Sequence, residues 1–470
     1  MVRLNSERRR QKTSQEAYPQ REVVNTPGHE MGQSSRPTQT RGRIHEERHS
    51  NLLEQILEKE NLKKALRRVE LNKGAPGIDG VTVENLKPHI RKNWVRIREE
   101  LFNGSYKPAP VRRVEIPKPG GGVRLLGIPT VIDRLIQQAI LQILTPIYDP
   151  TFSSSSYGFR PGRSAHQAVK QAQRYIMQGC EYVVDIDLEK FFDRVNHDIV
   201  MSKLTKRIAD KRILRLIRAY LQAGVMLNGC CITTEEGTPQ GGPLSPLLSN
   251  IVLDELDVEL EKRGHRFIRY ADDCNIYVKS ERAGLRVMTS VTQFVERKLK
   301  LKVNREKSAV DRPWKRKVLG FSFTRQKEAR IRLAYKTKGQ FKENIRKITR
   351  RTWGVSMQER IKKLNSYLKG WMGYFSLAQT PSVIAELDEW IRRRLRTCLL
   401  KQWKNPETKQ RNLVALGIPA AWAIKISWSR KKCWRLSNTP QINKALGLAY
   451  WQEQGLESLV VRYGALRSTV

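Results

Sequence analysis

The chain has 470 residues, of which 39% are hydrophobic, and its formal net charge is +42. A chain of this length is expected to form more than one domain, and its apolar content excludes a wholly disordered protein. No apolar run approaches the roughly 18 residues of a membrane span, and Met1–Arg10 lacks the apolar segment of a secretory signal. The basic excess predicts a polyanionic partner, with nucleic acid as the first candidate; a surface kept basic for solubility is the alternative.

Cysteines and histidines give no sign of a metal-binding or disulfide-bonded module. None of the six cysteines forms a Cys-x-x-Cys pair, and all seven histidines lie at or before His265. We therefore expect a reduced, cytoplasmic protein without a C-terminal histidine-metal nuclease module.

The first part of the chain changes from an irregular to a helical pattern. Residues 1–50 hold ten basic and six acidic residues without periodicity, which is typical of a flexible basic arm. A helical pattern begins near Asn51, residues 74–80 predict a loop, and a second helix is expected over Val83–Phe102 until Pro108–Pro110 ends it.

From Val111 to about Glu328, predicted strands and helices alternate, which indicates an α+β fold. The predicted elements are strands at Arg112–Ile116 and Val123–Leu126, a helix at Ile132–Tyr148, a strand at Tyr182–Leu188, a helix at Pro243–Lys262 and a hairpin over Phe267–Val278.

Residues 329–470 are helical by pattern and carry a net charge of +21, against +17 for the longer segment 51–328. They also hold eight of the ten tryptophans, and rings interleaved with cations suit base stacking and phosphate contact. Packing of these rings in helical cores is the alternative. The two densest basic runs are the candidate nucleic-acid contacts: Arg392, Arg393, Arg394 and Arg430, Lys431, Lys432.

Two acidic motifs carry the chemical signal. Asp185 and Asp187 alternate along a predicted strand and so share one face, and Asp272 and Asp273 lie at the turn of a predicted hairpin. Adjacent carboxylates repel unless a cation lies between them. Mg²⁺ prefers such oxygen ligands, and two ions about 3.5–4 Å apart catalyse phosphoryl transfer.

The sequence resembles the reverse transcriptases encoded by group II introns, also called maturases, from about Asn51 to the C-terminus. The resemblance rests on Tyr270-Ala271-Asp272-Asp273 and its order after Asp187 and the loop Pro239–Pro246. Further stretches that resemble the family are Gly74–Gly80, Ile116–Arg134, Tyr157–Arg163, Asp185–Arg194, Leu299–Lys307 and Leu319–Phe321.

The resemblance implies a right-hand polymerase fold with fingers and palm at 51–328, a thumb and maturase domain at 329–400, and a basic DNA-binding region at 401–470. It also implies the class without a C-terminal endonuclease domain, similar to group IIC. The implied activity is RNA-directed DNA synthesis that copies intron RNA for retrohoming, together with intron RNA binding that promotes splicing. The implied partners are intron RNA, a template–primer duplex, target DNA and a deoxynucleoside triphosphate.

The resemblance also assigns roles to single residues. Asp187, Asp272 and Asp273 would be the catalytic ligands of two Mg²⁺ ions, while Asp185, two residues too early, would be structural. The triphosphate would be held by Lys118 and Arg124, with Gln240 beside the nucleotide and Phe192 as a steric gate against the ribose 2′-hydroxyl. Leu319, Gly320 and Phe321 would form the primer grip.

Other functions remain open from the sequence. A maturase that acts only in splicing would have lost its polymerase residues, which this chain retains. A related reverse transcriptase could instead serve a CRISPR system, a retron or a diversity-generating element. An RNA-dependent RNA polymerase is disfavoured by the bulky Phe192. The sequence does not indicate an oligomeric state.

Overall fold

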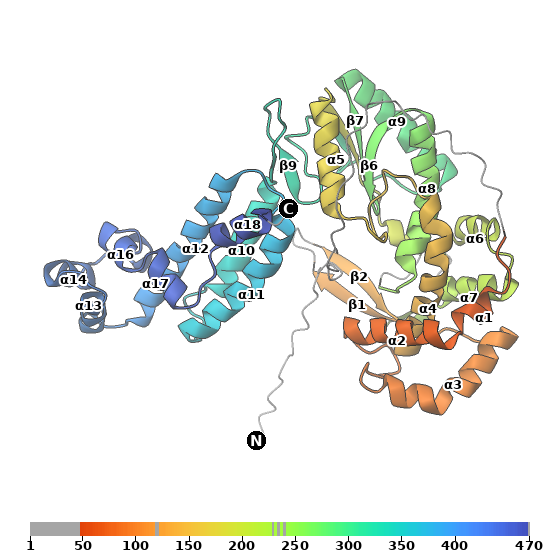
Figure 1. The fold of residues 1–470 in the computed structure, drawn as a ribbon, viewed down its shortest axis with the longest axis horizontal. Coiled ribbons are helices and arrows are strands. Elements are labelled where there is room, and N and C mark those ends of the chain that lie inside the picture. The colour runs from red at the N-terminus through yellow and green to blue at the C-terminus, as the bar shows by residue number, and fades with distance from the viewer. Residues whose placement is uncertain (1–47, 118–121, 228–229, 233–235, 238–240, 469–470) are drawn as a thin grey trace. The chain divides into compact units, whose positions relative to one another are not determined.

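The computed structural model of the protein describes residues 48–117, 122–227, 230–232, 236–237 and 241–468. These residues form two compact units, shown in Figure 1. The larger unit comprises the described residues of His45–Arg346 together with Leu377–Val383, and the smaller unit those of Lys347–Ser376 and Ile384–Val470.

Helices make up most of the larger unit. They are α1 (Leu52–Ile56), α2 (Lys59–Asn72), α3 (Leu86–Asn103), α4 (Val131–Tyr148), α5 (Ala165–Met177), α6 (His197–Thr205), α7 (Lys211–Gln222), α8 (Ser245–Lys262), α9 (Glu281–Lys298) and α10 (Tyr335–Ile348), with short 3-10 helices at Asp149–Thr151 and Phe191–Asp193. Polar capping residues mark the N-terminal ends of several of these helices. At α5, the Ser164 hydroxyl accepts from the backbone N–H of Gln167, and the Gln167 side chain accepts from the backbone N–H of Ser164.

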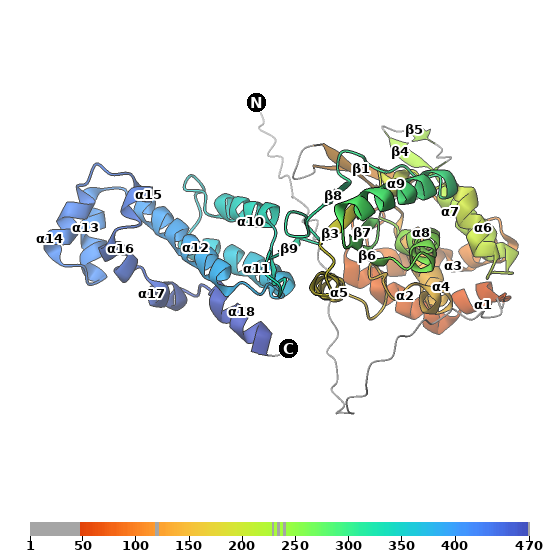
Figure 2. The ribbon, with the colours of Figure 1, turned by 90° about the horizontal axis from the view of Figure 1, so that it is seen from above.

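The strands of the larger unit form three sheets. They are β1 (Val111–Pro117), β2 (Val123–Ile128), β3 (Tyr182–Ile186), β4 (Val225–Leu227), β5 (Cys230–Ile232), β6 (Arg266–Tyr270), β7 (Asp273–Val278), β8 (Ala309–Asp311), β9 (Phe321–Phe323) and β10 (Ile331–Leu333). The orders are β2-β1-β4-β5, β6-β7-β3-β8 and β10-β9. Helices α5, α8 and α9 pack against the β6-β7-β3-β8 sheet, as Figures 1 and 2 show.

One hydrophobic core joins the helices α1–α4 and α6–α9 to this sheet. Helix α4 is central to it, because most of its side chains are buried and α2 packs along it. Buried Asn61 of α2 donates to the carbonyls of Ile56 (2.9 Å) and Ala139 (3.2 Å), which ties α1, α2 and α4 together. The core thereby supports the sheet that carries the acidic motifs.

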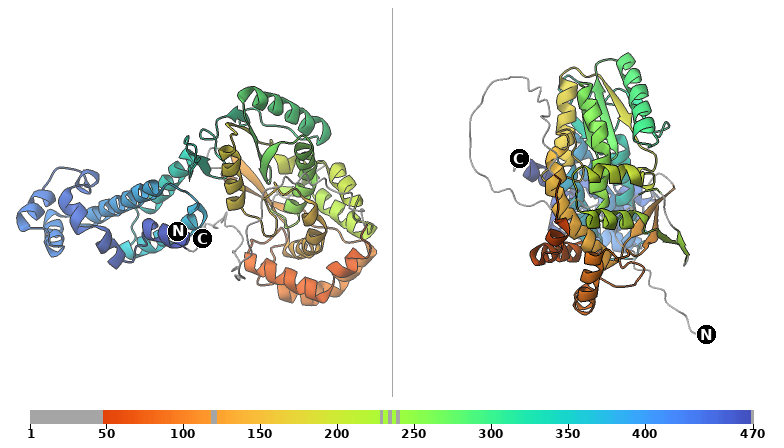
Figure 3. Two further views of the ribbon diagram at one scale, coloured as in Figure 1. Left: turned by 45° about the horizontal axis from the view of Figure 1, so that its top comes forward. Right: turned by 90° about the vertical axis from the view of Figure 1, so that its right-hand side faces the viewer.

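The smaller unit is helical. Its elements are α11 (Met357–Phe375), α12 (Pro381–Gln402, from Ile384 onward), α13 (Pro406–Ala415), α14 (Ala420–Ser427), α15 (Cys433–Leu436), α16 (Pro440–Ala445), α17 (Leu448–Glu453) and α18 (Leu459–Ser468). Helices α13 and α14 lie side by side beyond one end of α12, as Figures 2 and 3 show. Of the eight tryptophans after residue 329, Trp451 is fully buried, whereas Trp422, Trp428 and Trp434 are exposed.

The expected α+β fold is confirmed, with small shifts at element ends. The helical pattern after Asn51 forms two helices, because the chain is extended at Glu58. The strand expected over Tyr182–Leu188 ends at Ile186, since the N–H and C=O of Asp187 bond to Ser308 and Asn304 rather than to a neighbouring strand. Among the described residues, no helix combines the length and hydropathy that a membrane span requires.

The expected boundary at residues 328 and 329 stays a prediction; the compact units divide near residue 346. The expected arm at 1–50 lies almost wholly outside the described residues.

Candidate active site

The strand register brings the two acidic motifs to the same end of the sheet. Strand β3 pairs antiparallel with β7, with Asp185 opposite Asn275 and Ile186 opposite Cys274. One further step along this register sets Asp187 opposite Asp273, the first residue of β7. Strands β6 and β7 pair through Tyr270 and Asp273, so Ala271 and Asp272 form a two-residue turn.

The three carboxylates influence one another electrostatically. Burial is the main cause that raises the pKa of Asp272, and the charge of Asp187 raises it further. Asp273 is exposed to solvent at the turn. Partial desolvation of its carboxylate by the surrounding protein is the main cause that raises its pKa to about 7, and the charge of Asp272 is the next. Among the residues that the structure describes, Asp187 pairs with the exposed Lys307, whose Nζ lies 3.5 Å from its Oδ2. Like charges gathered in this way are stabilised by a cation between them.

The donor set fits a hard divalent cation that keeps some of its own water. Among the described residues, no three His, Cys, Asp or Glu side chains converge closely enough to enclose a metal ion. Mg²⁺ does not require such a cage, because it is typically bound by one or two carboxylates, waters and substrate phosphates. Carboxylates at one end of a sheet, open to solvent at Asp273, meet that requirement.

Asp185 is bound by protein partners. Its carboxylate accepts from Arg316 Nη2 (2.6 Å) and Nε (3.1 Å) and from Asn275 Nδ2 (2.9 Å). These contacts leave Asp185 engaged on the sheet, in agreement with the structural role expected from its position.

Of the residues expected around the nucleotide, the structure describes Arg124 and Phe192, whereas Lys118 and Gln240 lie outside the described residues. Arg124 is exposed on β2, and its charge lowers the pKa of Asp272, so the two side chains are near enough to interact electrostatically. Phe191 is buried in the core with 2% of its surface exposed. Half-buried Phe192 packs edge-on against it, with 5.2 Å between the two ring centres.

The glycines after Gln240 have a packing role that the sequence did not indicate. Gly241 has φ +127°, and a Cβ there would lie 2.6 Å from the carbonyl oxygen of Gly127 in β2. A Cβ on Gly242 would meet the side chain of Gln137 in α4. The backbone at Gly241 and Gly242 therefore approaches β2 and α4 closely.

The expected primer grip forms a tight turn. Val318 and Phe321 exchange two backbone hydrogen bonds of 2.9 Å, and Leu319 and Gly320 between them have φ values of +50° and +88°. The Thr337 hydroxyl donates to the Gly320 carbonyl at 2.7 Å. Phe321 is fully buried, so only Leu319 and the backbone of the turn are accessible to a primer strand.

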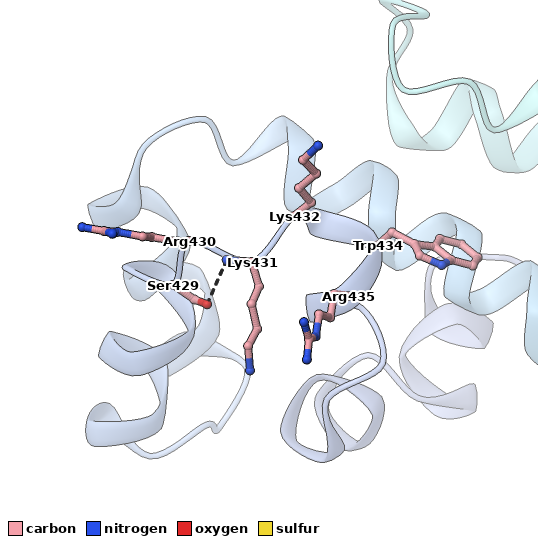
Figure 4. Close-up of a pocket in the computed structure, with 6 residues that line it drawn as sticks. All are labelled: Ser429, Arg430, Lys431, Lys432, Trp434 and Arg435. Carbon is pink, nitrogen blue, oxygen red and sulfur yellow. Dashed lines mark hydrogen bonds between the residues drawn. The ribbon is translucent and has the colours of Figure 1, made fainter.

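The two basic runs of the smaller unit differ in their surroundings. In α12, Arg392 pairs with Asp388, Arg393 stacks 4.1 Å from the Trp434 ring centre, and Arg394 donates to Thr349. Arg430, Lys431 and Lys432 are exposed and line a shallow pocket with Ser429, Trp434 and Arg435, as Figure 4 shows. Their role as nucleic-acid contacts stays a prediction for both runs.

Sequence reasoning missed Arg269, which is fully buried next to the acidic turn and donates to the carbonyl of Ala271 at 2.9 Å. It also missed Arg316, the partner of Asp185. The sequence around neither arginine indicates its role, because the carboxylates that they bind, Asp257 and Asp185, lie on other elements.

Family models match the chain in two parts. The model for reverse transcriptase (RNA-dependent DNA polymerase) matches residues 116–323, and that for the group II intron maturase-specific domain matches residues 339–417. A reverse transcriptase domain is a divalent-metal-dependent polymerase that acts on nucleic acid.

Two curated proteins and one solved structure illustrate what this chain is similar to. Protein YkfC of Escherichia coli is 34% identical over 299 residues, which cover 55% of this chain and 78% of YkfC. The group II intron-encoded protein LtrA of Lactococcus lactis is 41% identical over 187 residues, 40% of this chain and 31% of LtrA. The chain thus spans about a third of the length of LtrA. Among solved structures, a partial Cas6-RT-Cas1–Cas2 complex is similar, with 26% identity, a TM-score of 0.35, and coverage of 53% of this chain and 43% of that one.

The two domain models occur in order, the alignment spans most of YkfC, and the acidic residues of the polymerase motif meet at one end of a sheet. The chain therefore belongs to the group II intron-encoded reverse transcriptases, which combine an RNA-directed DNA polymerase with a maturase domain for splicing.

Proposed function

We propose that this chain copies a group II intron RNA into DNA for retrohoming and binds the same RNA to promote its splicing. The observation that carries the proposal is the meeting of Asp187 with the Asp272–Asp273 turn at one end of the sheet, with Arg124 near enough to Asp272 to interact electrostatically. A maturase that acts only in splicing has no need of this arrangement.

The residues of the site divide the work of nucleotidyl transfer. Two Mg²⁺ ions held by Asp187, Asp272 and Asp273 would activate the primer hydroxyl and neutralise the leaving pyrophosphate. Arg124 and Lys118 would bind the triphosphate oxygens, where cations stabilise the charge that develops.

Substrate selection falls to the neighbouring residues. Gln240 would contact the nucleotide from the palm. Phe192 would fill the space beside the sugar carbon 2, with its ring packed against buried Phe191. The turn at Leu319–Phe321 would press on the primer strand.

The remaining partners are assigned by charge and position. We expect polymerase residues at 51–328, a thumb and maturase domain at 329–400, and a DNA-binding region at 401–470. The exposed Arg430, Lys431 and Lys432 would contact target DNA, with Arg392, Arg393 and Arg394 as further contacts. This work would take place in the cytoplasm, where intron RNA is made and spliced.

Primer extension on an RNA template tests the proposal. The wild-type chain should make DNA with Mg²⁺, and the double variant Asp272→Asn/Asp273→Asn should make none while still binding intron RNA. Asp198→Asn, which removes an exposed carboxylate on α6, is the matched control and should retain activity. A wild-type chain that binds intron RNA and promotes splicing, yet makes no DNA, would establish the splicing-only function instead.

A further inference from the structure

Arg269 is the penultimate residue of β6, three positions before Asp272, and its side chain is fully buried. A buried arginine is rare unless its charge is paired and its donors are bound. The energetic cost of placing a cation in the interior of the larger unit calls for a role beyond filling space.

Every donor of the Arg269 guanidinium has an acceptor. Nε and Nη2 donate to the two carboxylate oxygens of Asp257 at 2.7 and 2.6 Å. Nη1 donates to Asn250 Oδ1 at 2.9 Å, and Nη2 also donates to the Ser156 hydroxyl at 2.8 Å. The fifth donor is the second N–H of Nη1, which bonds to the backbone carbonyl of Ala271 at 2.9 Å.

This fifth bond reaches the acidic turn itself. Ala271 has φ +56°, a left-handed conformation that is uncommon for alanine and persists where the surroundings enforce it. Asp257 and Asn250 both lie on α8, so the guanidinium connects the Ala271 carbonyl to a buried helix. A planar fork with five fixed donors suits such a connection in a way that the single ammonium of lysine does not.

A second contact holds the turn from the other side. The Gly158 carbonyl accepts from Asn250 Nδ2 at 2.9 Å, and a Cβ on Gly158 would come within 2.9 Å of the Tyr270 carbonyl carbon. Asn250 therefore binds both Gly158 and Arg269, so α8 fixes the two supports of the turn together.

We propose that Arg269 is a positioning residue of the polymerase site. By holding the Ala271 carbonyl against α8, it sets where the carboxylates of Asp272 and Asp273 lie. The inference rests on the proposed function, because it specifies how the catalytic turn of that function is held. The competing account is that the Arg269–Asp257 pair only stabilises the packing of β6 on α8.

A double variant separates the two accounts. Arg269→Met/Asp257→Leu replaces a buried ion pair with apolar side chains, an exchange that is often neutral for stability. It leaves the Ala271 carbonyl without its donor. Arg160→Lys is the matched control, because Arg160 is also a buried arginine paired with an aspartate, Asp149, and bonded to backbone carbonyls. None of its bonds reaches the acidic turn.

The measurements are single-nucleotide incorporation kinetics, the Kd for template–primer, the melting temperature, and binding of Mn²⁺ followed by electron paramagnetic resonance. For the double variant we expect kcat to fall by about tenfold to a hundredfold, because ångström-scale misplacement of catalytic groups has effects of that size. The KM for the nucleotide and the Kd for template–primer should stay within about twofold of wild type. Mn²⁺ binding should weaken, and Arg269→Lys should show an intermediate kcat.

A double variant that melts near the wild-type temperature and keeps kcat within twofold would overturn the inference. The inference would also fail if the kcat of the double variant fell only in proportion to the fraction of protein that is unfolded. A destabilised Arg160→Lys would show such a proportional loss. If the double variant does not fold, Arg269→Lys decides alone, through its kcat and its Mn²⁺ affinity compared with Arg160→Lys. An inactive wild-type chain would instead refute the proposed function.

Discussion

Replacing Gly158 with alanine should displace the acidic turn by a definable amount. The added Cβ would lie 2.9 Å from the Tyr270 carbonyl carbon, 3.2 Å from Ala271 Cα, and closer still to Ala271 N. Ordinary contact between such atoms begins at about 3.4 Å. All of these are backbone atoms, so no side chain can rotate away, and the turn must move by about half an ångström to one ångström.

A displacement of this size at a catalytic centre should lower kcat by about tenfold to a hundredfold, equivalent to about 1.4–2.7 kcal/mol in the activation barrier. Single-nucleotide incorporation at saturating nucleotide and template–primer measures it. Gly373→Ala, in an open position of α11, is the control and should gain about 0.5–1 kcal/mol of stability with unchanged kcat. A Gly158→Ala chain that melts like wild type and keeps kcat within about twofold would refute the reasoning.

Four further predictions follow from single features. Phe192→Ala should raise ribonucleotide incorporation relative to deoxynucleotide; unchanged sugar selectivity would remove Phe192 from the gate. Arg316→Ala should lower the free energy of unfolding by about 1–3 kcal/mol, because half-buried Asp185 loses its cationic partner. Urea unfolding measures this loss, and the double variant Arg316→Ala/Asp185→Asn should recover part of the stability. Burial raises the pKa of Asp133 above its unfolded value, so its contribution to stability falls as pH rises from about 4 through the folded pKa. Asp133→Asn should flatten this pH dependence, and an unchanged profile would contradict the assignment. Intron RNA affinity should fall steeply and log-linearly with salt; a flat profile would contradict phosphate-dominated binding.

The parts of the site predictable from sequence are those with local signals. Alternation along a predicted strand locates Asp185 and Asp187, and a two-residue turn between apolar strands locates Asp272 and Asp273, without knowledge of the tertiary fold. The choice of Asp187 over Asp185 came from the family resemblance. The α+β architecture was likewise predictable, because its strands and helices have distinct periods.

The supports of the turn were not predictable, because their partners are distant in sequence. Arg269 bonds to Ser156, 113 residues away, and to two residues of α8. A charged residue within a strand ordinarily indicates an exposed face, whereas both faces of β6 are covered near Arg269. The close approach of Gly241 to the Gly127 carbonyl of β2, at a positive φ, was likewise not predictable, because the two residues are distant in sequence.

The distribution of paired charges explains how an acidic site persists in a chain of net charge +42. Asp257 and Asp185, which lie beside the site, each bond to an arginine and are thereby neutralised. Among the described residues, Asp272 and Asp273 form no such ion pair, and Asp187 has only exposed Lys307 near it. Arg269 and Arg316 thus neutralise Asp257 and Asp185 and leave the three carboxylates that we propose as metal ligands with unbalanced charge. Burial raises the pKa values of Asp272 and Asp273, the neighbouring carboxylates raise them further, and a divalent cation would relieve this repulsion.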